Sequence, residues 1–267
     1  MSDPRATRSL TRAVSREIRI AAPIDAVWKA LTDADELTRW FPPVARVIPG
    51  AGGRVWRAWQ SGEEIEERIE RWLPNEHLRT VGLSGVWRDI TTDYHLTTQG
   101  GSTVLRVVSS GFGTDADWDA LYDAFGGGWD FELHGLRHYL EHHRGSPRRI
   151  ALARGRRPLS SAESWRRLVE AGGWMKERGL AVVAPGSRYA ATTVASASIS
   201  GNVVLWQPPH QLAATVDQFN NAYLRIDSRC VGEQGAPWIW LSVYGMPDDR
   251  VREIEREWQA ALDASLT

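Results

Sequence analysis

The stretch WLPNEHL at residues 72–78 recurs as WQPPHQL at residues 206–212, so the pattern Trp-x-Pro-x-x-x-Leu repeats 134 positions later. The same offset relates Arg54 to Arg188 and Gly111 to Gly245. An offset that stays constant from residue 54 to residue 111 is typical of a duplicated structural unit, because any insertion or deletion would break it. The sequence therefore predicts two tandem domains of the same fold.

Length and composition agree with two globular domains. The chain has 267 residues, 42% of them hydrophobic and 24% charged, with a formal net charge of −1. This balance argues against a nucleic-acid-binding surface. No apolar run approaches the roughly 18 residues of a membrane-spanning helix, and Cys230 is the single cysteine. We expect a cytoplasmic protein with no intrachain disulfide, no membrane span and no nucleic-acid partner.

Tryptophan is unusually abundant, with 14 residues in the chain. Each indole contributes a large apolar surface and one N–H that needs an acceptor. Fourteen such rings exceed what two small cores normally use. The abundance favours wide interiors that are lined by rings, and we expect hydrophobic cavities.

The first half predicts a short helix, a series of antiparallel strands and a long final helix. A strand at 17–21 precedes a helix with Asp25 as its N-cap. Alternating segments separated by Gly, Pro and Asn turns predict further strands at 54–60, 64–72, 78–83, 87–96 and 103–110. The last helix covers about 118–143, where Trp129, Leu133, Leu136 and Leu140 form one apolar stripe.

Three consecutive glycines, Gly126–Gly128, interrupt this last helical segment. Glycine inside a helix costs about 1 kcal/mol relative to alanine. Either the helix begins after the glycines, or small residues there leave room for another group against the backbone.

The second half repeats the plan in shortened form. Strands are expected at 187–194, 197–206, 212–218, 222–231 and 237–244, followed by a helix over 248–266. Trp165 and Leu168 repeat the spacing of Trp28 and Leu31, and Trp258 with Leu262 repeats that of Trp129 with Leu133. We expect domain 1 at 15–145, an Arg- and Pro-bearing connector at 146–160, and a divergent domain 2 at 161–267.

Several short strings carry a resemblance to a known superfamily: VWKALT at 27–32, LTRWFP at 37–42, GSTVL at 101–105, SGF at 110–112 and GW at 128–129. With the order helix, strands, long helix, they resemble the SRPBCC superfamily, which has the START-like or helix-grip fold. The branch that the strings resemble contains bacterial homologues of the heat-shock-ATPase activator and the calicheamicin-resistance proteins. The resemblance covers most of residues 15–143 and is weaker over 160–267.

The resemblance implies an α+β fold: two tandem helix-grip (START-like) domains, each a curved antiparallel sheet wrapped on a long C-terminal helix. It also implies a cavity for an apolar small molecule, as in relatives that bind lipids, hormones or polyketides. Many relatives have His-Ser-Gly-Phe where this chain has Ser109, Ser110, Gly111 and Phe112. One polar group that faces the cavity in those relatives is therefore replaced here by serine.

The candidate ligand-binding residues are the rings and one leucine that would surround such cavities. They are Trp40, Phe41, Trp56, Trp59, Trp87, Tyr94, Phe112, Phe125, Trp129, Leu133, Tyr189, Trp206, Tyr223, Tyr244 and Trp258. Polar groups for orienting a ligand could come from strand residues Arg57, Glu67, Arg71, Asp93 and His95. Each of these can equally face solvent, because alternate residues of a strand point to opposite sides.

His134, His138 and His142 are spaced at i, i+4 and i+8 in the last helix of domain 1. Taking the Trp129 stripe as 0°, they fall at about 140°, 180° and 220°, opposite the core face. Docking against the second domain or exposure to solvent explains this stripe better than a metal site. We expect no metal and no cofactor, since nucleotide-binding and serine-hydrolase motifs are also missing.

The sequence therefore leads to the hypothesis of a cytoplasmic protein that binds an extended hydrophobic molecule, such as a polyketide or polyene. The expected setting is bacterial secondary metabolism, such as enediyne or polyketide biosynthesis or self-resistance. A biosynthetic enzyme or carrier protein is a possible partner. One alternative is a polyketide cyclase or dehydratase, for which Asp93 and His95 are the only candidate acid–base pair. The other alternative is a chaperone-associated adaptor, which would use an exposed surface rather than a cavity.

Overall fold

The structure is a computed structural model, and it describes residues 11–60, 62–156, 159–176, 184–195, 197–229 and 236–266. Cys230 lies outside the described residues. The chain divides by its internal contacts into unit 1, Met1–Trp129, and unit 2, Asp130–Thr267. This division falls inside a helix rather than after it. No helix in the described ranges is long and apolar enough to cross a membrane.

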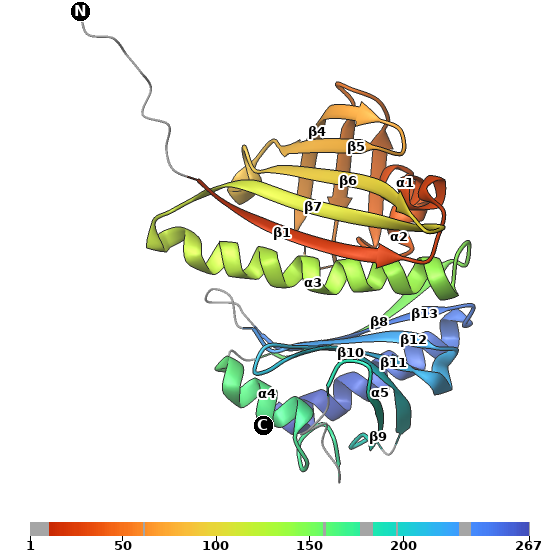
Figure 1. Cartoon of the computed structure of the whole chain (residues 1–267). Helices are drawn as coiled ribbons and strands as arrows, with labels where there is room; N and C mark the ends of the chain where they lie inside the picture. The colour runs from red at the N-terminus through yellow and green to blue at the C-terminus, as the bar shows by residue number, and fades with distance from the viewer. Residues whose placement is uncertain are drawn as a thin grey trace, which may run out of the picture. The chain divides into compact units, whose positions relative to one another are not determined.

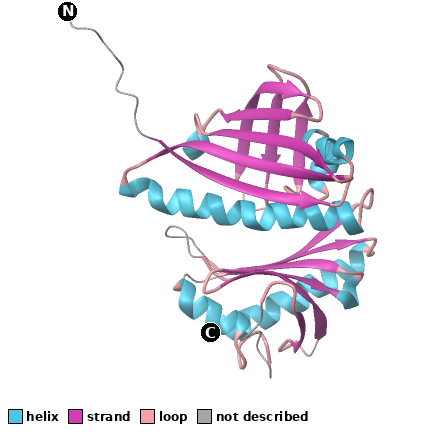
Figure 2. Ribbon diagram, in the orientation of Figure 1, coloured by secondary structure: helices cyan, strands magenta, loops and turns pink. Residues whose placement is uncertain are grey.

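Unit 1 contains a seven-stranded antiparallel sheet in the order β1-β7-β6-β5-β4-β3-β2 (Figures 1 and 2). Its strands are β1 Thr11–Ile20, β2 Val44–Ile48, β3 Arg54–Ala58, β4 Glu64–Leu73, β5 His77–Gly82, β6 Thr91–Gln99 and β7 Ser102–Gly113. Its helical elements are α1 Ile24–Thr32, α2 Ala34–Thr38, η1 Gly85–Trp87, η2 Ala116–Trp118 and the first part of α3 Asp119–His142.

Unit 2 contains a six-stranded antiparallel sheet in the order β8-β13-β12-β11-β10-β9. Its strands are β8 Arg148–Arg154, β9 Arg188–Thr192, β10 Ser198–Gln207, β11 Gln211–Val216, β12 Ala222–Asp227 and β13 Trp238–Tyr244. The remaining elements are α4 Ser161–Val169, η3 Asp217–Phe219 and α5 Asp248–Leu266. Each sheet is followed by a long helix, so the predicted α+β fold of two tandem helix-grip domains is confirmed.

The repeated heptapeptide forms the same hairpin in both sheets. Trp72 pairs with Leu78 across the β4–β5 turn, and Trp206 pairs with Leu212 across the β10–β11 turn. Each tryptophan meets a helical tryptophan edge to face: Trp28 of α1 lies 5.2 Å from Trp72, and Trp165 of α4 lies 5.0 Å from Trp206. The duplication therefore includes a helix-to-sheet contact as well as strand order.

Gly111 and Gly245, the other repeated positions, both have positive φ, at 107° and 71°. Glycine adopts this left-handed region without the steric cost that a Cβ imposes. Both glycines lie at the end of a strand that precedes a long helix. The repeat therefore preserves a backbone conformation.

One local expectation needs correction, and one open alternative is decided. Helix α1 begins at Ile24 with Pro23 as N-cap, and Asp25 lies in the first turn, where its carboxylate still favours the helix dipole. Helix α3 runs through Gly126–Gly128 without a break. A Cβ on Gly126 would lie 3.1 Å from the Arg16 guanidinium and 3.8 Å from Val14, so a small residue there lets β1 approach the helix.

The segment expected as a connector contains β8, which pairs with the last strand of its sheet just as β1 pairs with β7. Four arginines in 148–156 gave this segment the appearance of a linker. Ala151 and Ala153 nevertheless alternate inward and are buried in the core of unit 2. Strand β8 thus supplies the counterpart of β1.

Candidate functional site

A small internal cavity lies in unit 1, against the face of the sheet that α1 and α2 cover. Its volume is about 10 Å³, roughly the space that one water molecule needs. The cavity is lined by Leu31, Leu37, Trp40, Phe41, Val55, Arg57, Glu67, Leu78, Thr80 and Tyr94. Two helices and four strands contribute to this lining, which is apolar apart from one polar end.

The polar end is a buried ion pair. Arg57 on β3 and Glu67 on β4 form a salt bridge, and both side chains are buried. Thr80 donates its hydroxyl hydrogen to Glu67 Oε1 at 2.9 Å, and the Arg57 guanidinium lies 5.1 Å from the centre of the Phe41 ring. Arg57 Nε has no hydrogen-bond partner among the residues that the structure describes.

Tyr94 completes this polar end from strand β6. Burial raises the pKa of its hydroxyl, although Arg57 nearby opposes the shift. The ring therefore stays neutral at physiological pH and can act as a hydrogen-bond donor. A guanidinium and a phenol at one end of an apolar cavity can together bind a carbonyl, carboxylate or hydroxyl group of a ligand.

Strand alternation explains which side chains face the cavity. Val55 and Arg57 point inward from β3, whereas Trp56 between them lies on the outer face beneath the Arg46 guanidinium, 4.7 Å away. Trp56 was expected to bind ligand, and this expectation is wrong for the cavity described here. Arg71 likewise does not line the cavity.

A connected group of rings extends from the cavity along α3. Phe41 lies 5.8 Å from Trp129, which contacts Phe125 at 6.4 Å. Phe125 in turn meets Phe112 at 5.0 Å and Trp87 at 5.2 Å.

Three further residues that were expected to bind ligand belong to the same group of rings. Trp40 stacks on Phe41, Trp59 meets Phe41 edge to face, and Tyr94 meets Trp129 edge to face. The rings predicted for domain 1, apart from Trp56, therefore form one connected cluster. Leu133 is buried in α3 beyond this cluster.

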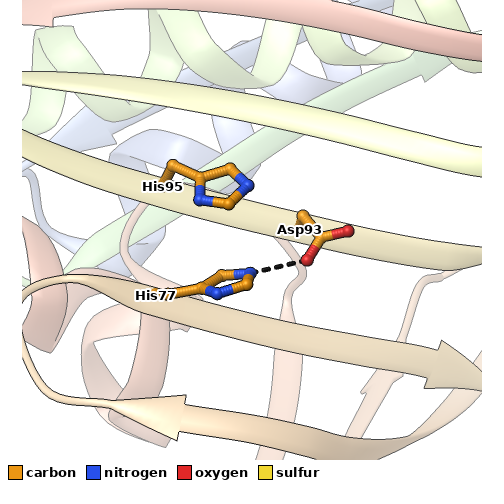
Figure 3. Close-up of side chains that lie close together, drawn as sticks. All are labelled: His77, Asp93 and His95. Carbon is orange, nitrogen blue, oxygen red and sulfur yellow. Dashed lines mark hydrogen bonds and ion pairs between the residues drawn. The ribbon is translucent and has the colours of Figure 1, made fainter.

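Asp93 and His95, the candidate catalytic pair, lie on the opposite side of the sheet. Tyr94 between them faces the cavity, so its two neighbours on β6 point to the outer face. There Asp93 accepts a hydrogen bond from His77 at 2.6 Å (Figure 3). It accepts two more from Arg79, at 2.8 and 2.9 Å. The pair shares one face as expected, but that face is not the one that bounds the cavity.

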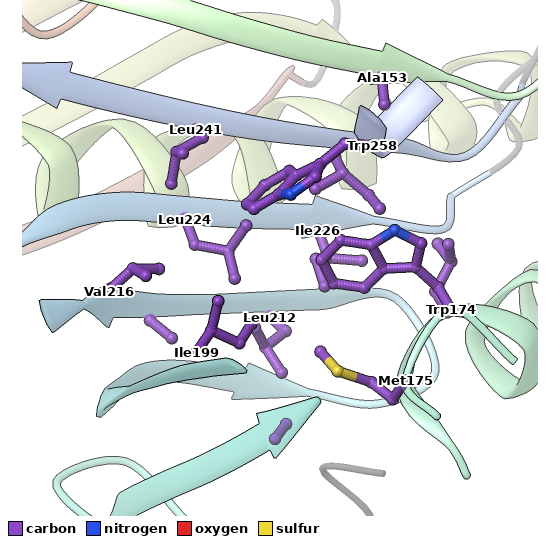
Figure 4. Packing of buried hydrophobic residues seen from close by; sticks show 14 of the residues in the cluster. Ala153, Trp174, Met175, Ile199, Leu212, Val216, Leu224, Ile226, Leu241 and Trp258 are labelled. Carbon is purple, nitrogen blue, oxygen red and sulfur yellow. The ribbon is translucent and has the colours of Figure 1, made fainter. Parts of the chain in front are cut away.

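In unit 2, many of the described side chains pack together between the sheet and α5. Figure 4 shows Trp174 and Trp258 packed among aliphatic side chains, with their ring centroids 5.2 Å apart. Tyr189 belongs to the same buried cluster, and Trp206 packs against it. Of the expected ligand-binding residues of domain 2, Tyr189 and Trp258 are therefore core residues in this structure, and Trp206 is partly buried against the same core.

The other two expected residues of domain 2 lie on the opposite face of the second sheet. Tyr223 donates its hydroxyl hydrogen to the Phe131 carbonyl oxygen of α3 and stacks on His138 at 5.4 Å. Tyr244 stacks on His143 at 4.2 Å. Leu224 and Val243, their neighbours along the strands, point into the α5 core instead. Tyr223 and Tyr244 therefore do not face the interior beneath α5.

The histidine stripe of α3 packs against this face. His138 is buried and donates from Nε2 to the Asn221 carbonyl oxygen at 2.7 Å, and burial is the main cause that lowers its pKa to about 3. His134 is half-buried, with its pKa lowered to about 4 mainly by burial, and His142 is exposed. Of the two explanations preferred for this stripe, packing rather than exposure to solvent therefore applies to His138. A buried ion pair, Arg225 with Glu132 at 2.6 Å, lies nearby.

Sequence reasoning missed part of the cavity lining. Leu31, Leu37, Val55, Leu78 and Thr80 line the cavity but were not singled out. The aliphatic ones follow ordinary helix and strand periodicity, which does not separate cavity lining from core. Thr80 lies inward on β5 and donates to Glu67 on β4, although its strand partner on β4 is Ile69.

Three comparisons with known proteins place the chain among its relatives. No curated protein matches the sequence. The Aha1 dimer from Colwellia psychrerythraea, a solved structure, is 20% identical with a TM-score of 0.46, covering 50% of this chain and 99% of its own.

Two further solved structures are similar at low identity. DynU16, from the dynemicin biosynthetic locus, is 18% identical with a TM-score of 0.43 and covers 94% of this chain and 96% of its own. CalU16 from Micromonospora echinospora is 23% identical with a TM-score of 0.40, covering 50% of this chain and 87% of its own. A family model described as polyketide cyclase / dehydrase and lipid transport matches residues 11–141. Within this part of the chain, which contains the whole first sheet, the sequence is similar to the polyketide cyclase / dehydrase and lipid transport family.

Proposed function

We propose that unit 1 binds a hydrophobic small molecule of the polyketide or lipid type that carries a polar group at one end. The apolar part of the ligand packs against the ring cluster of Phe41, Trp129, Phe125 and Phe112. The polar group binds at Arg57. The description of the family whose model matches residues 11–141 supports this class of ligand.

The single observation that carries the proposal is the buried guanidinium of Arg57 at the end of an apolar cavity. Removing a charged pair from water costs several kcal/mol per ion, and a good ion pair only roughly offsets this cost. Apolar residues would fill the same space at least as stably. A buried Arg57 whose Nε lacks a partner among the described residues is therefore better explained by a ligand that accepts its hydrogen bond.

The ligand has to enlarge the cavity, because about 10 Å³ holds only one water molecule. Phe41 is the side chain whose movement opens it. It is half-buried, it follows the short helix α2, and it separates the cavity from Trp59 and Trp129. Rotation of Phe41 joins the cavity to the space along the ring cluster, which suits an elongated molecule.

The proposal concerns unit 1 alone. Described side chains such as Trp174 and Trp258 pack against each other beneath α5 in unit 2. The expected contribution of a second cavity therefore finds no support among the described residues. Binding is also favoured over cyclase or dehydratase chemistry, because Asp93 and His95 lie on the face of β6 opposite to the cavity-lining Tyr94.

The test uses cis-parinaric acid, a fluorescent polyene carboxylic acid, and its methyl ester. The full chain is titrated while tryptophan-sensitised emission of the polyene is recorded. We expect saturable binding of the acid with a stoichiometry of one. We expect the double variant Arg57→Met/Glu67→Leu, which replaces the buried ion pair by apolar side chains of similar volume, to lose at least about tenfold in affinity for the acid and little for the ester.

The matched control is Arg46→Met, which removes a guanidinium from the outer face above Trp56. It should leave both affinities unchanged. Phe41→Ala enlarges the cavity and should therefore increase the affinity for the polyene or its association rate. Absence of saturable binding of both acid and ester to the wild-type chain would refute the proposed function. Equal loss of affinity in the Arg46 and Arg57 variants would refute the role of the ion pair.

A further inference from the structure

Three potential metal ligands meet on the outer face of the first sheet. His77 begins β5, and Asp93 and His95 are alternate residues of β6, so all three side chains point to the same side (Figure 3). His77 and His95 are direct cross-strand partners. One ligand atom from each of the three residues lies within 4.8 Å of the other two.

The geometry is set by rigid elements and open to solvent on one side. Asp93 is buried, His77 is half-buried and His95 is exposed. The two imidazole rings lie face to face with centroids 4.2 Å apart. A site on paired strands varies less in shape than one on loops, and the exposed His95 leaves room for a water ligand.

Asp93 is ionised and oriented by its neighbours. Burial raises the pKa of Asp93, but hydrogen bonds and charge from Arg79 and His77 outweigh this effect and lower it overall. Arg79 holds both carboxylate oxygens. Such an outer hydrogen bond is the usual way in which proteins orient a carboxylate that binds a metal.

The second sheet shows that the fold does not require this group. The hairpin register aligns His77 with Gln211, because the paired Trp72 and Leu78 correspond to the paired Trp206 and Leu212. Gln211 pairs with Asp227, which therefore takes the place of His95.

Arg225 stands two residues before Asp227, at the position of Asp93, and forms an ion pair with Glu132. The same three positions in unit 2 thus hold glutamine, arginine and aspartate. The two histidines therefore occur in the first sheet and not at the equivalent positions of the second. On the first sheet, His95 is exposed to solvent.

We propose that His77, Asp93 and His95 form a binding site for a divalent transition-metal ion of the Zn²⁺ class. Two imidazole nitrogens and one carboxylate oxygen are the ligand set of open zinc sites, which keep a water in the fourth position. Ligands at about 2.0–2.2 Å from the metal lie about 3.4 Å apart in a tetrahedral arrangement. The spread of up to 4.8 Å closes to this value by side-chain rotation, chiefly of the exposed His95.

Metal binding replaces one hydrogen bond by three bonds from protein atoms to the metal. The His77–Asp93 hydrogen bond at 2.6 Å is replaced by coordination of both atoms, while Arg79 keeps its contact with the second carboxylate oxygen. Arg79 and Arg106, the cross-strand partner of His95, oppose the incoming cation.

The test is calorimetric titration of the full chain, freed of metal by chelation, with ZnCl₂ at pH 7.5, accompanied by Co²⁺ absorption spectroscopy. We expect one Zn²⁺ per chain, and visible Co²⁺ bands typical of a low-coordinate site. His95→Ala, which alters an exposed side chain, should weaken Zn²⁺ binding by at least about tenfold. Asp93→Asn should do the same and abolish the Co²⁺ bands.

His210→Ala is the matched control, because His210 is an exposed histidine outside this group. It should bind Zn²⁺ as the wild type does. The proposal is overturned if wild-type protein binds no Zn²⁺, or if His95→Ala and His210→Ala bind it equally well. Thermal melts of each metal-free variant show whether a loss of binding reflects a loss of fold. Since the site lies opposite the cavity, parinaric acid binding should be unaffected by His95→Ala.

Discussion

Protonation of His138 should make unit 2 sensitive to mild acid. His138 is only 5% exposed, and its folded-state pKa is lowered to about 3, chiefly by burial and then by the neighbouring His143. The unfolded chain has a histidine pKa of about 6.5. Between these two values the unfolded state binds one more proton than the folded state, so stability falls as the pH falls through this window.

The magnitude follows from the separation of the two pKa values. Each pH unit within the window is equivalent to about 1.4 kcal/mol, so this one side chain reduces the free energy of unfolding by about 3 kcal/mol between pH 6.5 and pH 4.5. The full loss, approached near pH 3, is about 5 kcal/mol. A typical domain has only about 5–15 kcal/mol of stability, so the effect is large enough to unfold unit 2.

The assay is urea unfolding followed by far-ultraviolet circular dichroism at several pH values from 7 to 4, with hydrogen exchange of peptides from β12 and β13 to report on unit 2. His138→Gln keeps an N–H that can donate to the Asn221 carbonyl oxygen but does not titrate. It should reduce the dependence of stability on pH by about 1.4 kcal/mol per pH unit between pH 6 and 4. His210→Gln, at an exposed position, should not. An unchanged slope in His138→Gln would refute the reasoning.

Further predictions concern packing and buried charge. Gly128→Ala should raise stability by about 1 kcal/mol in thermal melts, because a Cβ there meets no atom within 4 Å and alanine favours the helix. Gly201→Ala should prevent folding of unit 2, seen as lost dispersion in NMR spectra, because its Cβ would lie 1.9 Å from the Thr215 carbonyl oxygen. Glu132→Gln leaves Arg225 buried without its anion and should cost about 3–5 kcal/mol in urea unfolding. Trp72→Ala removes the edge contact with Trp28 and should lower the free energy of unfolding by about 3 kcal/mol in urea unfolding. Replacing a lysine or arginine at the surface by alanine is the control and should leave this free energy unchanged.

Sequence periodicity predicted the elements because each is built from local physical preferences. Alternation over 64–72 and 103–110 corresponds to β4 and β7, and the apolar stripe from Trp129 to Leu140 corresponds to α3. The repeated hairpin residues and the left-handed Gly111 and Gly245 express turn geometry, which depends on a few neighbouring residues. These features can be predicted without knowing which distant residues they contact in the folded chain.

Strand β8 was not predicted, because its several arginines are typical of a linker and the alternation of Ala151 and Ala153 is a weak strand signal. The burial of these two alanines depends on β13 beside them and on α5 above, which lie about 90 positions or more further along the chain. A short strand with small inward residues has too little local signal to be distinguished from a linker. Its identity is a property of the sheet that it completes.

The amino-acid sequence alone determined the duplicated helix-grip architecture, the turns and most strand and helix positions, because local propensity and periodicity encode them. Only the tertiary structure decided that Tyr94 faces the cavity while Asp93 and His95 face outward, since a period of two does not say which side is the interior. Cross-strand register places His77 opposite His95, and tertiary packing buries Trp174 and Trp258 beneath α5. These outcomes depend on contacts between residues far apart in the chain, which no local pattern specifies.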